Sequence, residues 1–112
     1  MNDTNIWHGA SGKAYNYFIF PIVFDFQSDQ DGNYIFCSQT VQGWKPIYIG
    51  EGDIKERTQF HIKDGSISQK GATHIHVHLR RSEMERKDEE IDLLNKYGKS
   101  HSPKERNVKV GG

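Results

Sequence analysis

The chain has 112 residues, enough for a single hydrophobic core but too few for two domains. Lysine plus arginine and aspartate plus glutamate each number 15, so the formal net charge is zero and the molecule as a whole has no long-range attraction for nucleic acid. The most apolar segment, residues 15–26, is interrupted by polar residues and is shorter than the roughly 20 apolar residues of a membrane helix, which predicts a soluble protein with no membrane partner.

The N-terminal quarter is polar first and apolar afterwards. Residues 1–13 lack the positively charged leader of a signal peptide, and we expect a loosely held arm in which Trp7 is a docking anchor. Residues 15–26 are aromatic and β-branched, which predicts one or two strands broken near Pro21. Residues 1–31 are therefore expected to form an arm and extra strands that pack on the same domain as the rest of the chain.

Two further strands are predicted over residues 34–40 and 46–50, after a turn near residues 29–32. The turn Gln42-Gly43 separates them, so a hairpin is the simplest arrangement. Cys37, the only cysteine, lies inside the first of these strands. A single cysteine excludes a disulfide within the chain and predicts a buried, inert thiol in a cytoplasmic protein.

A helix over residues 54–62 is predicted to follow, because Asp53 is a good N-cap. Arg57 and His61 are four residues apart and lie on one face of this helix, beside the end of the strand that carries Tyr48. A phenol, a guanidinium and an imidazole would then converge. These groups supply a proton acceptor, a permanent cation that fits phosphate and a side chain that titrates near neutral pH, and together they suit phosphodiester chemistry.

The C-terminal half is predicted to contain one strand and one helix. Residues 73–79 alternate strictly, which puts His74, His76 and His78 on one strand face. Ser82 and Glu85 have the spacing of a capping box for a helix that ends near Gly98. The expected apolar stripe of that helix consists of Met84, Ile91, Leu94 and Tyr97. This order of elements predicts an α+β fold with a small, mainly antiparallel sheet flanked by helices and extended by the N-terminal strand segment.

Several of these residues, taken in order, resemble the motifs of the GIY-YIG nuclease family, a small α/β domain whose members cut DNA with one divalent metal ion. The two triplets that name the family are similar to Gly32-Asn33-Tyr34 and Tyr48-Ile49-Gly50, although Asn33 stands where the first triplet usually has an apolar residue. The remaining motifs resemble Arg57, His61, Glu90 ahead of Leu93-Leu94, Pro103 and Asn107. The resemblance covers residues 32–107, and residues 108–112 are expected to be a flexible tail.

The resemblance implies an endonuclease that hydrolyses DNA with Mg²⁺ or Mn²⁺ held by Glu90. Arg57 would stabilise charge on the phosphoryl oxygens, and Tyr34 or Tyr48 would take or relay the proton of the attacking water, with His61 receiving or orienting it. Because a free phenol has a pKa of about 10, a tyrosine base would require nearby cations that favour its phenolate. The candidate DNA contacts are Lys55, Arg80, Arg86, Lys99 and Lys104. Site preference, biological role and oligomeric state, monomer or dimer, are not predicted.

Other interpretations of the same residues remain open. The row His74, His76 and His78 resembles the histidine-triad nucleotide hydrolases and transferases, could hold Zn²⁺, or could be an exposed strand face. The two tyrosines could be core residues, the helical Arg57 and His61 a solvated face, and Glu90 an ion-pair partner of Arg86. A third class of function is a non-catalytic DNA-binding relative.

Overall fold

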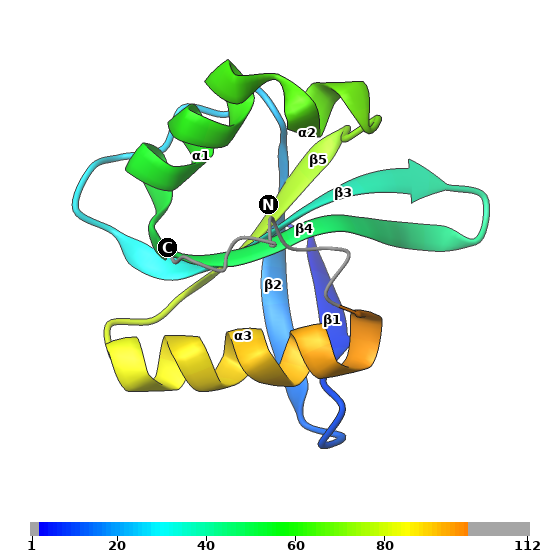
Figure 1. The fold of residues 1–112 in the computed structure, drawn as a ribbon, viewed down its shortest axis with the longest axis vertical. Coiled ribbons are helices and arrows are strands. Elements are labelled where there is room, and N and C mark those ends of the chain that lie inside the picture. Colours follow the sequence, from blue (N-terminus) through cyan, green and yellow to red (C-terminus); the bar gives the residue numbers. More distant parts are fainter. Residues whose placement is uncertain (1–2, 99–112) are drawn as a thin grey trace.

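The computed structural model describes residues 3–98, which form five strands and three helices (Figure 1). The elements are β1 Thr4–His8, β2 Ala14–Pro21, β3 Asp31–Thr40, β4 Gly43–Asp53, α1 Ile54–Asp64, α2 Ser66–Gln69, β5 His74–Leu79 and α3 Glu83–Tyr97. All paired strands are antiparallel, and their order in the sheet is β1-β2-β5-β3-β4. The predicted α+β class with an antiparallel sheet is confirmed.

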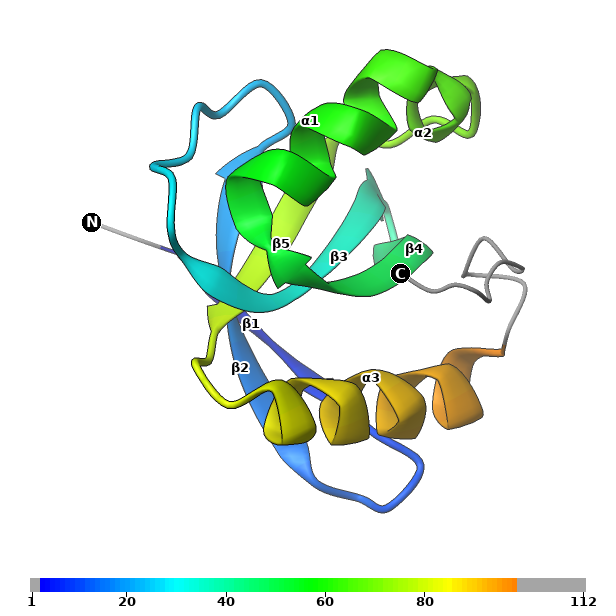
Figure 2. The same ribbon diagram turned by 60° about the vertical axis from the view of Figure 1, so that its left-hand side comes forward.

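The helices lie on opposite faces of the curled sheet, α1 and α2 on one face and α3 on the other (Figures 1 and 2). Side-chain alternation along β3 supplies both cores. Tyr34 and Phe36 belong to the core beneath α1 and α2, whereas Ile35 and Cys37 belong to the core beneath α3. As expected, Cys37 is fully buried, and burial raises the pKa of its thiol. No helix within residues 3–98 is long and apolar enough to cross a membrane.

The predicted helix starts are confirmed by their N-caps, while α1 extends to Asp64, two residues beyond the predicted end. The Asp53 carboxylate accepts a hydrogen bond of 2.9 Å from the Glu56 amide, and the Ser82 hydroxyl accepts one of 3.2 Å from the Glu85 amide. Helix α1 ends at Gly65, which has a φ of 87°, a left-handed conformation that glycine adopts without strain. These caps fix where each helix begins and hence the positions of the site residues along it.

Within the described residues 3–13 the N-terminal arm is not loosely held, which corrects the expectation for that part of residues 1–13. Residues 4–8 form strand β1, which pairs with β2, and β2 in turn pairs with β5. Trp7 is only 3% exposed, and its Nε1 donates a hydrogen bond of 2.9 Å to Nδ1 of His76. Trp7 is therefore a core residue rather than a docking anchor.

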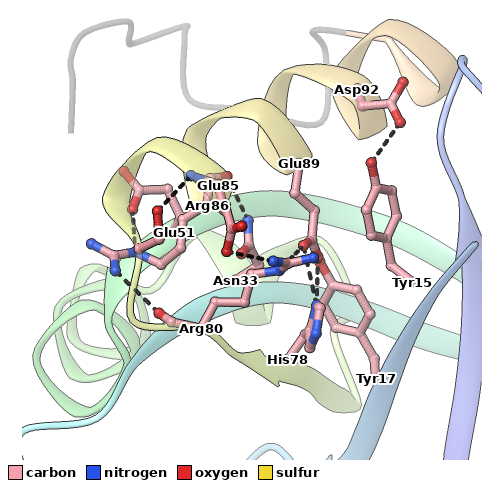
Figure 3. A network of polar contacts seen from close by, with 11 residues as sticks. Tyr15, Tyr17, Asn33, Glu51, His78, Arg80, Glu85, Arg86, Glu89 and Asp92 are labelled. Carbon is pink, nitrogen blue, oxygen red and sulfur yellow. Dashed lines mark hydrogen bonds and ion pairs between the residues drawn. The ribbon is translucent and has the colours of Figure 1, made fainter. Parts of the chain in front are cut away.

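The inward face of α3 also differs from the predicted apolar stripe. Met84 and Ile91 are 74% and 56% exposed, while Arg86, Glu89 and Leu93 are the buried positions of the helix. The reason is that polar side chains of the sheet lie beneath the first half of α3, so the helix turns charged groups toward them (Figure 3). The apolar pattern of the helix could not predict this orientation of α3, because the polar side chains that it faces come from strands far away in the sequence.

Candidate functional site

The structure brings together four of the predicted catalytic side chains, from β3, β4 and α1. The hydroxyl of Tyr34 lies 3.1 Å from Nε2 of His61. The ring of Tyr48 lies 4.2 Å from that of His61, and the two tyrosine rings are stacked at 6.1 Å. Arg57, one helical turn before His61, interacts with both phenols through hydrogen bonds and charge. The result is a compact cluster of two hydroxyls, an imidazole and a guanidinium.

Two glycines of β4 make room for this cluster. Tyr34 is paired across the strands with Gly50, and a Cβ atom at residue 50 would lie 2.5 Å from the Tyr34 hydroxyl oxygen. Gly52 has a φ of 137°, and a Cβ atom there would lie 3.2 Å from Cγ of Arg57. The glycine at the end of Tyr48-Ile49-Gly50 is therefore required by the close approach of the phenol, which gives this short motif a physical reason.

Burial controls the protonation of Tyr34, which is 1% exposed. Desolvation raises the pKa of Tyr34 well above its ordinary value, the charges of Tyr48 and Glu90 add to this increase, and Arg57 opposes it. Arg57 thus acts in the direction that a tyrosine base requires, but desolvation outweighs it. Tyr34 is a neutral phenol at pH 7, and its hydroxyl shares a hydrogen bond with Nε2 of His61 whose direction depends on the histidine tautomer.

Arg57 is held as a cation inside the same cluster. Desolvation lowers the pKa of Arg57, but the hydrogen bonds and charge interactions with Tyr34 and Tyr48 outweigh this effect and raise it. Its Nε is buried and has no hydrogen-bond partner among the described residues. A buried donor without a partner is costly, and a group that accepts from it would be stabilised.

Glu90 is half-buried and belongs to α3, which covers the other face of the sheet (Figure 2). Its charge contributes to the raised pKa of Tyr34, so its carboxylate is within electrostatic range of that phenol. The neighbouring Glu89 is 2% exposed, and three side chains of the fold hold its carboxylate in place. Its carboxylate accepts from the Tyr17 hydroxyl at 2.6 Å, lies 2.9 Å from Nδ1 of His78 and binds Nε of Arg80 at 3.1 Å (Figure 3).

Arg86 anchors α3 to β4 and is not an exposed cation. It is 7% exposed, and its Nε donates to the Glu51 carboxylate at 2.9 Å (Figure 3). The guanidinium also donates to the backbone carbonyls of Arg80 and Arg81, at 3.1 and 2.7 Å. The amide of Asn33 donates to the Arg86 carbonyl at 2.8 Å. This burial contradicts the prediction that Arg86 contacts DNA and assigns it to the interior.

Sequence analysis missed the partners of Arg86, although two signals were present. Glu51 lies two residues after Ile49, so strand alternation places both on the α3 face of the sheet. Asn33, the polar residue in a triplet position that is usually apolar, is fully buried beneath the same helix.

Of the other predicted DNA contacts, Lys55 and Arg80 lie within the described residues, and both pair with acidic side chains. Nζ of Lys55 lies 3.2 Å from the Asp25 carboxylate and donates to the Phe26 carbonyl at 3.1 Å. Arg80 forms ion pairs with Glu85 at 2.7 Å and with Glu89 at 3.1 Å. Both cations are partly compensated by acidic neighbours. Lys99, Pro103, Lys104 and Asn107 lie outside the described residues.

The three histidines of β5 do not form an exposed row. His76 is fully buried and its ring lies 4.5 Å from that of Trp44, so the expectation of an exposed strand face is wrong at this position. Burial, with a smaller contribution from His74, lowers the pKa of His76 to about 4. His74 contacts the Thr73 hydroxyl at 2.8 Å, and His78 contacts Glu89.

The described residues contain no group of three or more histidine, cysteine, aspartate or glutamate side chains that could hold a metal ion. The zinc interpretation of the histidine row therefore has no support within residues 3–98. Mg²⁺ is a different case, because it is commonly bound by one or two carboxylates and otherwise by water and phosphate oxygens. Glu90, a partly exposed carboxylate within electrostatic range of the Tyr34 phenol, fits that donor set.

Comparison of the chain with protein-family models, curated proteins and solved structures found no match. The functional argument therefore depends on the residues and geometry described above.

Proposed function

We propose that this protein is a metal-dependent endonuclease of the GIY-YIG type that hydrolyses DNA phosphodiester bonds. The observation that carries the proposal is the buried contact of 3.1 Å between the Tyr34 hydroxyl and His61 Nε2, packed against the Arg57 guanidinium. A buried hydroxyl, imidazole and guanidinium cost solvation free energy, and a purely structural role would be served as well by apolar side chains of similar volume.

Arg57 supports the proposal as a group that neutralises charge on the transferred phosphoryl oxygens. Two phenol oxygens orient the guanidinium, and its buried Nε has no partner among the described residues. The planar guanidinium fork matches phosphate and stays charged at every physiological pH. Because the cation is preorganised, charge that develops on phosphate would be stabilised without reorganisation of the protein.

The pair Tyr34 and His61 supports a proton relay. Tyr34 is a neutral phenol in hydrogen-bond contact with His61. In the tautomer that leaves Nε2 unprotonated, Tyr34 would accept a proton at its oxygen while it passes its own to Nε2. Tyr48, whose ring lies 4.2 Å from His61, is the second candidate for direct contact with the attacking water. In both arrangements His61 receives the proton, and a permanently ionised tyrosine is not needed.

Glu90 would hold Mg²⁺ or Mn²⁺ at the edge of the cluster. When bound, such an ion supplies Lewis acidity that stabilises the leaving oxygen of the phosphodiester. The contribution of the chain would be to keep the Glu90 carboxylate within electrostatic range of Tyr34, on a helix that the ion pair of Arg86 with Glu51 anchors to β4.

A plasmid assay tests the proposal. Supercoiled DNA is incubated with Mg²⁺ or Mn²⁺ and with wild type, Arg57→Ala, Glu90→Ala or the control Asp88→Asn, which changes an exposed carboxylate on the same helix. We expect nicking by the wild type and the control, and a loss of at least about a hundredfold in the other two variants.

Two results would contradict the proposal, and each would favour a different function. If the wild type binds DNA but leaves it uncut in both metals, the protein is a non-catalytic DNA-binding relative. Hydrolysis of adenosine phosphoramidate that is lost in His76→Ala would favour the histidine-triad interpretation. The burial of His76 and its hydrogen bond from Trp7 weigh against that outcome, because its imidazole has no access to a phosphate.

A further inference from the structure

A cavity of about 310 Å³ lies on the same side of the sheet as α1, beside β2 and β5. Its apolar lining consists of Phe18, Phe20, Phe24, Phe26, Val77 and Leu79. None of the lining residues comes from α1 or α2, so this part of the sheet face is left open by the helices that cover β3 and β4. A concave apolar site with a few polar groups is the usual form of a ligand pocket.

The walls of this pocket are aromatic and mutually packed. The rings of Phe20, Phe24 and Phe26 lie between 4.6 and 5.1 Å from one another. Phe26 is buried and belongs to the core beneath α1, so it fixes one wall. In contrast, Phe18 and Phe24 are 42% and 45% exposed. The pocket therefore offers ring faces on a rigid base, a surface on which a planar aromatic ligand would stack.

The mouth of the pocket is polar and carries both signs of charge. Asp25 and Gln27 are exposed lining residues that offer a carboxylate and an amide. The ammonium group of Lys55 lies 3.2 Å from the Asp25 carboxylate. An apolar peptide side chain or a lipid tail would pack against the aromatic walls but would make no hydrogen bond or ion pair with the carboxylate, the amide or the ammonium group. A nucleotide would use all three features, since its base stacks, its exocyclic amino group donates to a carboxylate and its phosphate pairs with a lysine.

The pocket is close to the proposed catalytic cluster. Val77 lines the pocket and is paired across the strands with Tyr34. Lys55 lies in the first turn of α1, two residues before Arg57. In the sheet, β5 is next to β3 and β2 is one strand further away, and neighbouring strands are about 4.8 Å apart. The pocket beside β2 and β5 is therefore one to two strand spacings from β3, a distance that one or two nucleotides span.

We propose that the aromatic pocket between β2 and β5 binds an unpaired base of the DNA substrate next to the phosphodiester that is cut. The inference rests on the proposed nuclease function, and it gives that function a preference for DNA that contains an unpaired nucleotide. Asp25 favours bases with an exocyclic amino group, which are adenine, cytosine and guanine, over thymine.

Binding of labelled duplexes, measured by fluorescence anisotropy with EDTA present, tests the pocket separately from cleavage. The three duplexes are fully paired, carry one unpaired adenine, or carry an abasic nucleotide at the same place. Base stacking on aromatic side chains predicts that the unpaired adenine binds between about 5-fold and 150-fold more tightly than the abasic nucleotide. We expect Phe24→Leu and Phe18→Leu, which keep an apolar side chain, to remove most of this difference, and Asp25→Asn to reduce the preference for adenine over thymine.

Val41→Ala is the matched control, because Val41 is exposed in the turn between β3 and β4, away from the pocket. It should leave the difference unchanged. Equal affinity of the wild type for the unpaired and abasic duplexes would overturn the pocket assignment, as would an equal loss for all three duplexes in Phe24→Leu. If the base preference is present and depends on Phe24 but no DNA is cut in Mg²⁺ or Mn²⁺, the pocket stands and the nuclease proposal fails.

Discussion

The buried ion pair between Arg86 and Glu51 should be one of the strongest single contributions to the stability of the fold. The two side chains are only 9% and 13% exposed, and the guanidinium also donates to two backbone carbonyls in the connection between β5 and α3. Removal of one partner from such a pair leaves an uncompensated buried charge and costs about 3–5 kcal/mol. The small residual exposure of Glu51 places Arg86→Met at the lower end, about 3 kcal/mol.

The free energy of unfolding in urea at pH 7 measures this contribution. A loss of about 3 kcal/mol corresponds to a decrease in Tm of roughly 12–24 °C for a domain of this size. In the double variant with Glu51→Gln, the total loss should be smaller than the sum of the two single losses by about 1–3 kcal/mol, because the two groups are coupled.

Lys87→Met is the control, since Lys87 is exposed and lies 4.0 Å from the same Glu51 carboxylate. It should cost less than about 1 kcal/mol. Equal losses for Arg86→Met and Lys87→Met, or strictly additive losses in the double variant, would refute the reasoning.

Three further predictions follow from single positions. Gly50→Ala would place a Cβ atom 2.5 Å from the Tyr34 hydroxyl, so we expect a stability loss of about 1–3 kcal/mol in urea unfolding and reduced DNA cleavage; an unchanged protein would contradict the close approach. The pKa of His76 is lowered from 6.5 to about 4, so the neutral imidazole contributes about 3 kcal/mol above pH 6.5, and this is lost as the pH falls to about 4. Unfolding at pH 7 and pH 4.5 should show a smaller difference in His76→Gln than in wild type, whereas the exposed control His8→Gln should behave like wild type. Native Cys37 should resist a thiol reagent at pH 8 and react fully in urea, because its thiol is buried and its pKa is raised; rapid reaction of the folded protein would be inconsistent with that position.

Local signals were sufficient to predict the elements that hold the proposed site. Asp53 and Ser82 marked the helix starts within one residue, and the spacing of Arg57 and His61 placed them on one helical face. These features depend on capping and on the helical repeat, which act between residues a few positions apart. The predicted convergence of Tyr48 with His61 is present as a ring contact of 4.2 Å, whereas the contact of Tyr34 with His61 joins residues 27 positions apart and was not predicted by local signals.

Features that depend on distant partners could not be predicted in the same way. His76 alternates like an exposed histidine, but its environment is decided by Trp7, a residue 69 positions away in the sequence. Met84 and Ile91 match a helical apolar stripe, yet α3 turns Arg86 inward because Glu51 and the sheet beneath it are polar. A sequence pattern reports which residues share a face, but only the packing of the other elements determines whether that face is covered.

The adjacent carboxylates of α3, Glu89 and Glu90, differ in role: Glu89 has structural partners, whereas Glu90 is the proposed metal ligand. Successive side chains on an α-helix point about 100° apart, so a firm position for one fixes the direction of the next. Glu89 is held by Tyr17, His78 and Arg80, and this sets the rotation of the helix about its axis (Figure 3). Glu90, the next residue, is half-buried, and its charge acts on Tyr34. The cost of burying Glu89 is then offset by its three partners, while Glu90 keeps the partial exposure that a metal ligand with several water molecules requires.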